Sequence, residues 1–301
     1  MVETRYVTPD RPRAEALVAA ALRAAGQPVV PGEWQWVEHG SANLVVLAGT
    51  AAVRVGRTAS AAAESRRAQA LIDALPDLPF AVPRALADPL SDGDMVAIVQ
   101  RRLEGIPHPS GHGEATALER LLDALAAVPI DPHDPNLAIP HAFMGGGEWH
   151  PVIVEHAVPL LSPEVRDAAR QAADALAGLD PAPYALVHGD LAGSNVLWRG
   201  GTVAGVIDWD LASAGDPAVD VAALAVWHGW EVIERVRPPE VVRRARVVAA
   251  THPLQVIAFS IVNERPEAEV LRAAAWATAR LHSPDGMRRR TAHETGRETV
   301  R

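Results

Sequence analysis

Two short apolar runs near the N-terminus lie so close together in the sequence that they restrict how the chain can fold. Residues 44–48 and 51–55 are rich in valine, leucine and alanine, and only Gly49 and Thr50 separate them. Parallel neighbouring strands need a crossover of a dozen or more residues, whereas a two-residue turn is enough for an antiparallel hairpin. The spacing therefore predicts an antiparallel sheet in this part of the chain and not a βαβ unit.

Helical segments flank this hairpin in a pattern typical of an α+β fold. Residues 12–25 are predicted to be a helix, with Pro12 at its start and Gly26 just beyond its end. Residues 60–75 show helical spacing of apolar side chains, and residues 95–100 are a further strand candidate. The simplest solution is an antiparallel sheet that carries helices.

The rest of the chain is predicted to be mainly helical, with a few short strands and one loop-like stretch, rich in proline and glycine, at 129–151. The expected helices are 114–128, 163–179, 217–230, 238–250, 253–264 and 266–281, and the expected strands are 185–188, 196–198 and 203–207. We therefore predict a small lobe over 1–104, a larger lobe over 105–282 and a polar, arginine-rich, disordered tail over 283–301.

Composition narrows the range of functions. The chain has 301 residues, 49% of them hydrophobic, and a formal net charge of −9, which favours a globular protein and argues against nucleic-acid binding. It has no cysteine, which excludes disulfides and thiolate metal sites, and all 28 basic residues are arginine, so a lysine-dependent P-loop is also excluded. Because we find neither a signal-like N-terminus nor a run of about twenty apolar residues, we expect a cytoplasmic protein without a membrane partner.

Polar residues flank three consecutive apolar strands in the second half of the chain. Asp190 follows the first strand, Asn195 precedes the second, and Asp208 follows the third, thirteen residues after Asn195. A carboxylate and an amide oxygen are suitable ligands for Mg²⁺, which prefers oxygen and keeps places for water and phosphate. Asn195 and Asp208 are therefore candidate metal ligands, which leaves Asp190 free to accept a proton from an attacking hydroxyl.

This arrangement resembles the aminoglycoside phosphotransferase family of small-molecule kinases. His188-Gly189-Asp190 followed by Asn195 matches the family's H-G-D-x-x-x-x-N, and Ile207-Asp208-Trp209 matches its I-D-W/F segment. The resemblance implies a bilobal, protein-kinase-like α+β fold with ATP or GTP between the lobes and Mg²⁺ on the phosphates. It also implies that Asp190 is the catalytic base. A downstream stretch resembles G-D-P-x-x-D-L-A and supplies Asp216 and Asp220, which we expect, with His188, to support the site structurally.

The N-terminal lobe resembles the same family more loosely. The loop before the first strand of the hairpin supplies candidate phosphate contacts at Gly40, Ser41 and Asn43. Arg54 falls where the family carries Lys or Arg for the nucleotide phosphates, and Glu64 on the next helix is the candidate partner that orients it. Residues 99–102, with Gln100 and Arg102 as cofactor-binding candidates, resemble the hinge whose backbone would hold the purine.

The acceptor is predicted to be a small-molecule hydroxyl, with an aminoglycoside or macrolide antibiotic as the first choice. A housekeeping kinase of a sugar, an amino alcohol or homoserine carries the same motifs, and a nucleotide-binding protein that no longer catalyses is a second class. A serine hydrolase is disfavoured because Ser194 does not lie in a G-x-S-x-G elbow. No feature of the sequence indicates an oligomeric state.

Overall fold

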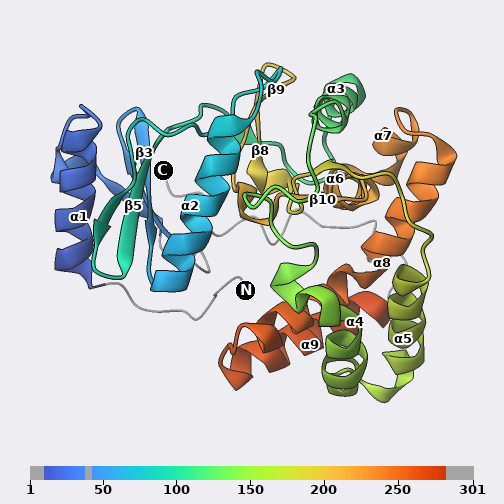
Figure 1. Ribbon diagram of the computed structural model, residues 1–301. Coiled ribbons are helices and arrows are strands. Elements are labelled where there is room, and N and C mark those ends of the chain that lie inside the picture. Colours follow the sequence, from blue (N-terminus) through green and yellow to red (C-terminus); the bar gives the residue numbers. More distant parts are fainter. Residues whose placement is uncertain (1–9, 38–42, 283–301) are drawn as a thin grey trace.

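The protein folds into two lobes. We describe it from a computed structural model of the chain, which places residues 10–37 and 43–282. In Figure 1 a small lobe built on an antiparallel sheet lies beside a larger lobe that is mostly helical. The predicted bilobal α+β fold is therefore confirmed, whereas the predicted tail at 283–301 lies outside the described residues and the boundary at 104/105 stays a prediction.

The small lobe contains a five-stranded antiparallel sheet in the order β1-β2-β3-β5-β4. The predicted hairpin is confirmed, because Ala48 pairs with Ala51 across the turn. The strands are β1 (Gln35–Val37), β2 (Asn43–Ala48), β3 (Ala51–Gly56), β4 (Leu90–Asp92) and β5 (Met95–Arg101). Helices α1 (Arg11–Ala24) and α2 (Ala59–Ala74) cover its two faces (Figure 1).

Helix α2 belongs to both lobes. It starts where the Thr58 hydroxyl accepts a hydrogen bond from the Ala61 N–H (3.2 Å), an N-cap of the usual kind. Near its C-terminal end, Leu71 and Ile72 are buried in the same apolar core as the strands and helices of the larger lobe. The helix therefore links the five-stranded sheet to the loops of the larger lobe.

Two small sheets in the larger lobe present the loops that carry the motifs. The three-stranded sheet has the order β6-β8-β9 and the two-stranded sheet pairs β7 with β10. Their bounds are β6 (Ile106–Pro107), β7 (Ala185–Val187), β8 (Val196–Arg199), β9 (Thr202–Val206) and β10 (Ser213–Gly215). The segment that leaves α2 joins this lobe too, since Ala81 pairs with Gly205 on β9. The loops after β7 and β9, and the turn before β8, therefore meet in one region.

Helices make up the rest of the larger lobe. They are α3 (Ala115–Ala126), α5 (Pro163–Ala177), α6 (Ala218–His228), α7 (Trp230–Glu234), α8 (Pro239–Val262) and α9 (Glu267–His282). The stretch predicted as a loop at 129–151 ends in irregular helix: α4 (Trp149–Pro151) continues as a π-helical run, Val152–Ala157, and a turn, Val158–Leu160. The proline and glycine residues of this stretch obscure the helical pattern in the sequence. In the structure, Ile153, Ala157 and Val158 are fully buried against α8 and α5.

Helix α8 corrects the prediction of two separate helices at 238–250 and 253–264. It is one continuous helix with Pro253 inside it. Proline removes one backbone hydrogen bond and ordinarily ends or bends a helix. Here Pro253 is buried, and the Thr251 hydroxyl donates to the Val248 carbonyl (2.7 Å) in the turn before it. Core packing on both sides of the proline keeps the helix continuous.

Helix α8 is also the one helix, within residues 10–37 and 43–282, that is long and apolar enough to cross a membrane by length and composition. Half of its most apolar window is buried inside the larger lobe. A core helix of a water-soluble protein passes the same test, so the finding is weak evidence for a membrane span.

Candidate active site

The loop after β7 is held from behind by α6. Asp220, in the first turn of α6, accepts hydrogen bonds from the backbone N–H groups of His188 (2.7 Å) and Gly189 (3.0 Å). Gly189 has φ +81°, and a Cβ at this position would lie 2.5 Å from the Leu211 carbonyl oxygen. Only glycine fits here without displacing the backbone that follows β9. The His-Gly-Asp motif is therefore a tight turn that aims Asp190 away from the strand.

Asp190 and Asn195 contact each other directly. The Asn195 amide nitrogen donates to the Asp190 carbonyl oxygen (2.8 Å) and to its carboxylate (3.1 Å). The backbone carbonyl of Asn195 accepts from the Ile207 N–H (3.0 Å), which places the segment of Asp208 beside it. Burial, together with the charge of Asp208, raises the pKa of Asp190 to about 7, against the hydrogen bond from Asn195. A carboxylate with such a pKa is suited to accept a proton near neutral pH.

Asp208 has a backbone conformation that non-glycine residues seldom adopt. Its φ is 66° and its ψ is 61°, in the left-handed region. Strain of this kind persists where the surroundings enforce it, and it gathers at functional sites. Trp209 supplies the enforcement: it is fully buried, donates from Nε1 to the Val206 carbonyl (3.0 Å) and packs edge-on against His188. The side chain of Asp208 itself is half exposed and turned toward Arg54.

Arg54 projects from β3 into the same region, but its partner is not the predicted one. Its Nη2 lies 2.5 Å from the Asp210 carboxylate and 3.5 Å from that of Asp208. Glu64 instead pairs with Arg67, one turn along α2 (2.8 Å). The expectation that Glu64 orients Arg54 is therefore wrong in this structure, because the nearer carboxylate comes from the turn after β9.

Asp210 is a site residue that the motif analysis missed. The only available signal was its position two residues after Asp208, and spacing alone does not show that its side chain turns toward β3. Besides Arg54, Asp210 accepts a hydrogen bond from the Asn43 amide (3.2 Å), so this predicted phosphate-loop residue reaches the site. The other predicted loop residues, Gly40 and Ser41, lie outside the described residues.

The hinge candidates are placed differently. The Gln100 side chain is buried and donates to the side-chain oxygen of Gln69 (2.6 Å), and its backbone is paired with Ala52 of β3 and bridged to Ala85. The Arg102 N–H donates to the Thr50 carbonyl (2.9 Å) and its guanidinium contacts the Gly49 carbonyl (3.3 Å). Arg102 is therefore bound to the β2–β3 turn, and its place in a nucleotide-binding hinge stays a prediction.

The expected supporting residues hold backbone in place. The His188 ring bonds to the Ile207 carbonyl (3.0 Å) through Nε2 and accepts from the Asp190 N–H (3.3 Å) through Nδ1. Asp216 accepts from the Ala218 N–H (2.9 Å) at the start of α6 and pairs with Arg244 (2.6 Å). These contacts join the residue before Asp208 to the loop after β7, and the end of β10 to α6 and α8.

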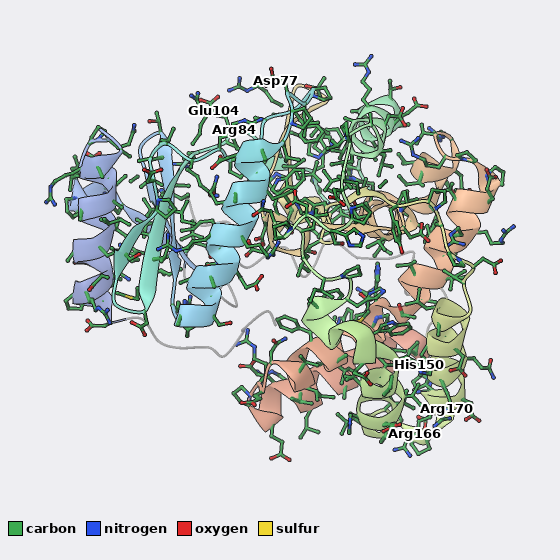
Figure 2. The ribbon with its side chains drawn as sticks, in the orientation of Figure 1. Asp77, Arg84, Glu104, His150, Arg166 and Arg170 are labelled. Atoms are coloured by element: carbon green, nitrogen blue, oxygen red, sulfur yellow. The ribbon has the colours of Figure 1, made fainter. Side chains whose placement is uncertain are left out.

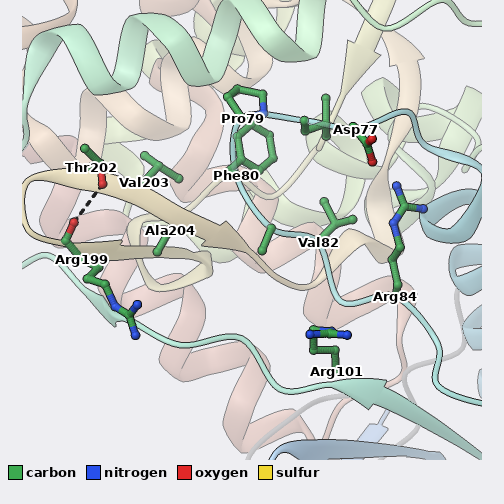
Figure 3. Close-up of a pocket in the computed structure, with 12 residues that line it drawn as sticks. Asp77, Pro79, Phe80, Val82, Arg84, Arg101, Arg199, Thr202, Val203 and Ala204 are labelled. Carbon is green, nitrogen blue, oxygen red and sulfur yellow. Dashed lines mark hydrogen bonds between the residues drawn. The ribbon is translucent and has the colours of Figure 1, made fainter.

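Two cavities lie away from Asp190 and Asp208. One, of about 640 Å³, is bordered by the segment after α2, by Arg101 and by the β8–β9 hairpin; Figure 3 shows Phe80 between Arg84 and Val203 there. Figure 2 places Asp77, Arg84 and Glu104 on that same side of the molecule. The other, of about 230 Å³, is bordered by the loop after β7 and includes Gly189 and Asp216. Neither includes Asp190 or Asp208.

The donor set fits a hard cation that is shared with a ligand. Asp190, Asp208 and Asp210 bring three carboxylates to one region and Arg54 brings one positive charge. One Asp210 carboxylate oxygen is buried with no hydrogen-bond partner among the described residues. Among residues 10–37 and 43–282, no group of three or more His, Cys, Asp or Glu side chains is arranged to hold a metal ion by itself. Excess negative charge and oxygen donors suit Mg²⁺ that completes its coordination with water and phosphate.

The chain is similar in sequence to known phosphotransferases. Residues 33–255 match the sequence model of the phosphotransferase enzyme family. Viomycin phosphotransferase from Streptomyces vinaceus is 34% identical over 226 residues, 66% of this chain and 75% of that protein. Hygromycin-B 4-O-kinase from Escherichia coli is 30% identical over 55% of this chain and 43% of that protein.

Solved structures agree on the fold. The GDP complex of wild-type aminoglycoside 2'-phosphotransferase-IIIa superimposes with a TM-score of 0.71 over 90% of this chain and 99% of that one, at 16% identity. Macrolide 2'-phosphotransferase type I gives 0.66 over 90% and 98%, at 22% identity. The match over most of the sequence, with the kinase-like fold and the Asp190 loop, leads to one conclusion: the chain belongs to the phosphotransferase enzyme family and is an enzyme that phosphorylates an alcohol group of a small molecule.

Proposed function

We propose that the protein transfers the γ-phosphate of ATP or GTP to a hydroxyl group of an antibiotic, with Asp190 as the base. The observation that carries this proposal is the continuous set of contacts from Asp190 through Asn195 to the Asp208 segment. The Asp190 carboxylate accepts the proton of the acceptor hydroxyl. At the same time the hydroxyl oxygen bonds to the γ-phosphorus, and the bond between that phosphorus and the leaving nucleoside diphosphate breaks. Asn195 donates its amide hydrogens to Asp190 and so fixes the orientation of that carboxylate.

The residues around the phosphates supply charge and position. Asn195 and Asp208 would hold Mg²⁺, which neutralises the phosphate oxygens when bound. Arg54, from β3, would contact the phosphates from the other lobe, and its guanidinium offers paired donors that suit phosphate oxygens. Such positioning and charge stabilisation supply most of the rate acceleration in phosphoryl transfer.

The acceptor is proposed from the relatives and from the charge of the chain. The two curated relatives are named for viomycin and hygromycin B, and neighbouring structures for aminoglycosides and macrolides. A net charge of −9 favours an acceptor with several positive charges over one with a single charge. We therefore place viomycin and the aminoglycosides ahead of the macrolides.

A nucleotide-release screen tests this function. The purified protein is incubated with Mg²⁺ and either ATP or GTP, and ADP or GDP release is measured with viomycin, hygromycin B, kanamycin, a macrolide, homoserine and choline. We expect turnover with a cationic antibiotic. Turnover with only homoserine or choline would show a housekeeping kinase, and nucleotide binding without turnover on any acceptor would favour a protein that no longer catalyses.

The base is tested by Asp190→Asn. This substitution keeps the shape of the side chain but removes the proton acceptor, so kcat is expected to fall by about 10²- to 10⁴-fold while the melting temperature is retained. Asp167→Asn is the matched control, because the Asp167 side chain is 91% exposed on α5. Turnover by Asp190→Asn at the wild-type rate would exclude Asp190 as the base.

A further inference from the structure

Arg54 is held by carboxylates of the segment after β9, and the closer one belongs to Asp210. The distance from Arg54 Nη2 to the Asp210 carboxylate is 2.5 Å, against 3.5 Å to Asp208. The side chains of Arg54 and Asp210 are only 11% and 20% exposed, so water screens their attraction weakly. The pairing crosses from the sheet of the small lobe to a turn of the larger lobe.

Helix α2 fixes Asp210 in two ways. Arg67 donates from Nη2 to the Asp210 backbone carbonyl (2.5 Å) and from Nη1 to the Asn136 carbonyl (2.7 Å). The Ser65 hydroxyl donates to the side-chain oxygen of Asn43 (2.9 Å), whose amide donates to the Asp210 carboxylate (3.2 Å). One contact therefore holds the backbone of Asp210 and the other holds its side chain.

Glu64, by contrast, has no contact with Arg54 among the interactions of the described residues. Its carboxylate accepts from Arg67 Nε (2.8 Å) and is directed along α2 instead of toward β3. With Glu64 bound to Nε, and carbonyls bound to Nη1 and Nη2, the Arg67 guanidinium has a partner on each of its nitrogens. Glu64 thus influences the site through Arg67.

We propose that Asp210 is the carboxylate that orients Arg54 for the nucleotide phosphates, and that Arg67 is the positioning residue through which α2 holds Asp210. The role of Arg54 toward phosphate rests on the proposed function, whereas the Arg54–Asp210 pair does not depend on it. Helix α2 then positions Arg54 through the turn after β9, which contains Asp210, and not through Glu64.

A double-mutant cycle without nucleotide tests the pair. Urea unfolding is measured for the wild type, Arg54→Met, Asp210→Asn and the double variant, with Asp167→Asn as the matched control. If the two side chains stabilise each other, the loss in the double variant is smaller than the sum of the two single losses. Additive losses would overturn the pair, and this result is independent of whether the protein is a kinase.

Nucleotide affinity tests the orienting role. For Asp210→Asn we expect the dissociation constant of Mg²⁺-nucleotide to rise by about tenfold or more, and for Glu64→Gln by less than about threefold, because glutamine still accepts from Arg67. In the Arg54→Met background, Asp210→Asn should add little. The reverse order, with Glu64→Gln the more damaging, would overturn the proposal.

Arg67→Met tests the link through α2. It is expected to weaken nucleotide binding in the same direction as Asp210→Asn and to add little to that substitution in a double variant. Independent, additive effects would show that Arg67 acts elsewhere. If the wild type bound no nucleotide at all, the proposed function would fail, and the unfolding cycle would still decide the Arg54–Asp210 pair.

Discussion

At the scale of single residues, His188 shows how burial sets a chemical state. The ring is fully buried and uses both nitrogens, one toward the Ile207 carbonyl and one toward the Asp190 N–H. Because an N–H group points at Nδ1, that nitrogen must accept a hydrogen bond and the ring must be neutral. Burial lowers the pKa of His188 to about 4, although the bond to Ile207 opposes the shift.

The buried histidine predicts a loss of stability in acid. In the unfolded chain a histidine binds a proton below a pH of about 6.5, whereas the pKa of His188 in the folded protein is about 4. Between these two values the unfolded state binds more protons, so the free energy of unfolding falls as the pH drops from about 6.5 to about 4. The contribution is at most about 3 kcal/mol. In urea unfolding between pH 7 and pH 4, His188→Gln should therefore show a shallower pH dependence than the wild type.

The exposed His133 supplies the control for that measurement. His133→Gln makes the same exchange at an exposed position, so it controls for the loss of one histidine without removing a buried ring. An identical slope in His188→Gln and the wild type would mean that His188 is not the group that the fold keeps neutral.

At the scale of elements, the C-terminal end of α2 depends on one arginine. The Arg84 guanidinium donates to the carbonyls of Ile72 (3.0 Å), Asp73 (2.9 Å), Leu75 (2.7 Å) and Pro76 (3.3 Å). The last carbonyls of a helix have no partner within it, and the negative end of its dipole attracts a cation. Arg84 meets both needs at the point where the chain turns toward β9.

Removing this cap should loosen α2. Arg84→Met is expected to lower the unfolding free energy by about 2–3 kcal/mol, since four charge-assisted hydrogen bonds to carbonyls are lost, two of them part-buried. Arg84→Lys should recover only part, because an ammonium group has no planar fork. The measurement is the urea midpoint at constant slope.

Arg101 borders the same cavity of about 640 Å³ as Arg84 (Figure 3). Its side chain is exposed, which makes Arg101→Met a matched control for Arg84→Met. Its effect should stay within about 0.5 kcal/mol. Equal losses in both variants would show that the loss of a guanidinium at either position, and not the loss of the cap on α2, accounts for the effect.

At the scale of the whole molecule, the site joins two lobes and the proposed ligands would bridge them. A ligand that binds only the folded state stabilises it by about 2.7 kcal/mol at one hundred times its dissociation constant. We expect Mg²⁺ with ATP or GTP to raise the melting temperature by several degrees, and EDTA to remove most of the shift.

Asp208→Asn separates the metal from the nucleotide in that experiment. Since Asp208 is a proposed magnesium ligand, the variant should lose the Mg²⁺-dependent part of the shift and retain its own melting temperature without ligand. A full nucleotide shift in EDTA would contradict the magnesium assignment.

The antiparallel hairpin and the order of the motifs could be predicted from the sequence, because a two-residue turn and the spacing of Asp190, Asn195 and Asp208 act over short stretches of chain. Features that depend on packing were missed. The π-helical run at Val152–Ala157 and the continuous α8 are stabilised by the apolar side chains around them, which override the local effect of proline and glycine.

Which carboxylate forms an ion pair with Arg54 depends on how the two lobes pack, and the sequence does not show it. Asp210 and Glu64 both lie near a motif in the sequence, and Asp210 is 156 positions from Arg54 along the chain. Ion pairing depends on distance through space, and α2 and the turn after β9 set that distance when the lobes pack. The motifs thus name the chemistry, whereas the packing of α2 against the larger lobe selects the side chains that carry it out.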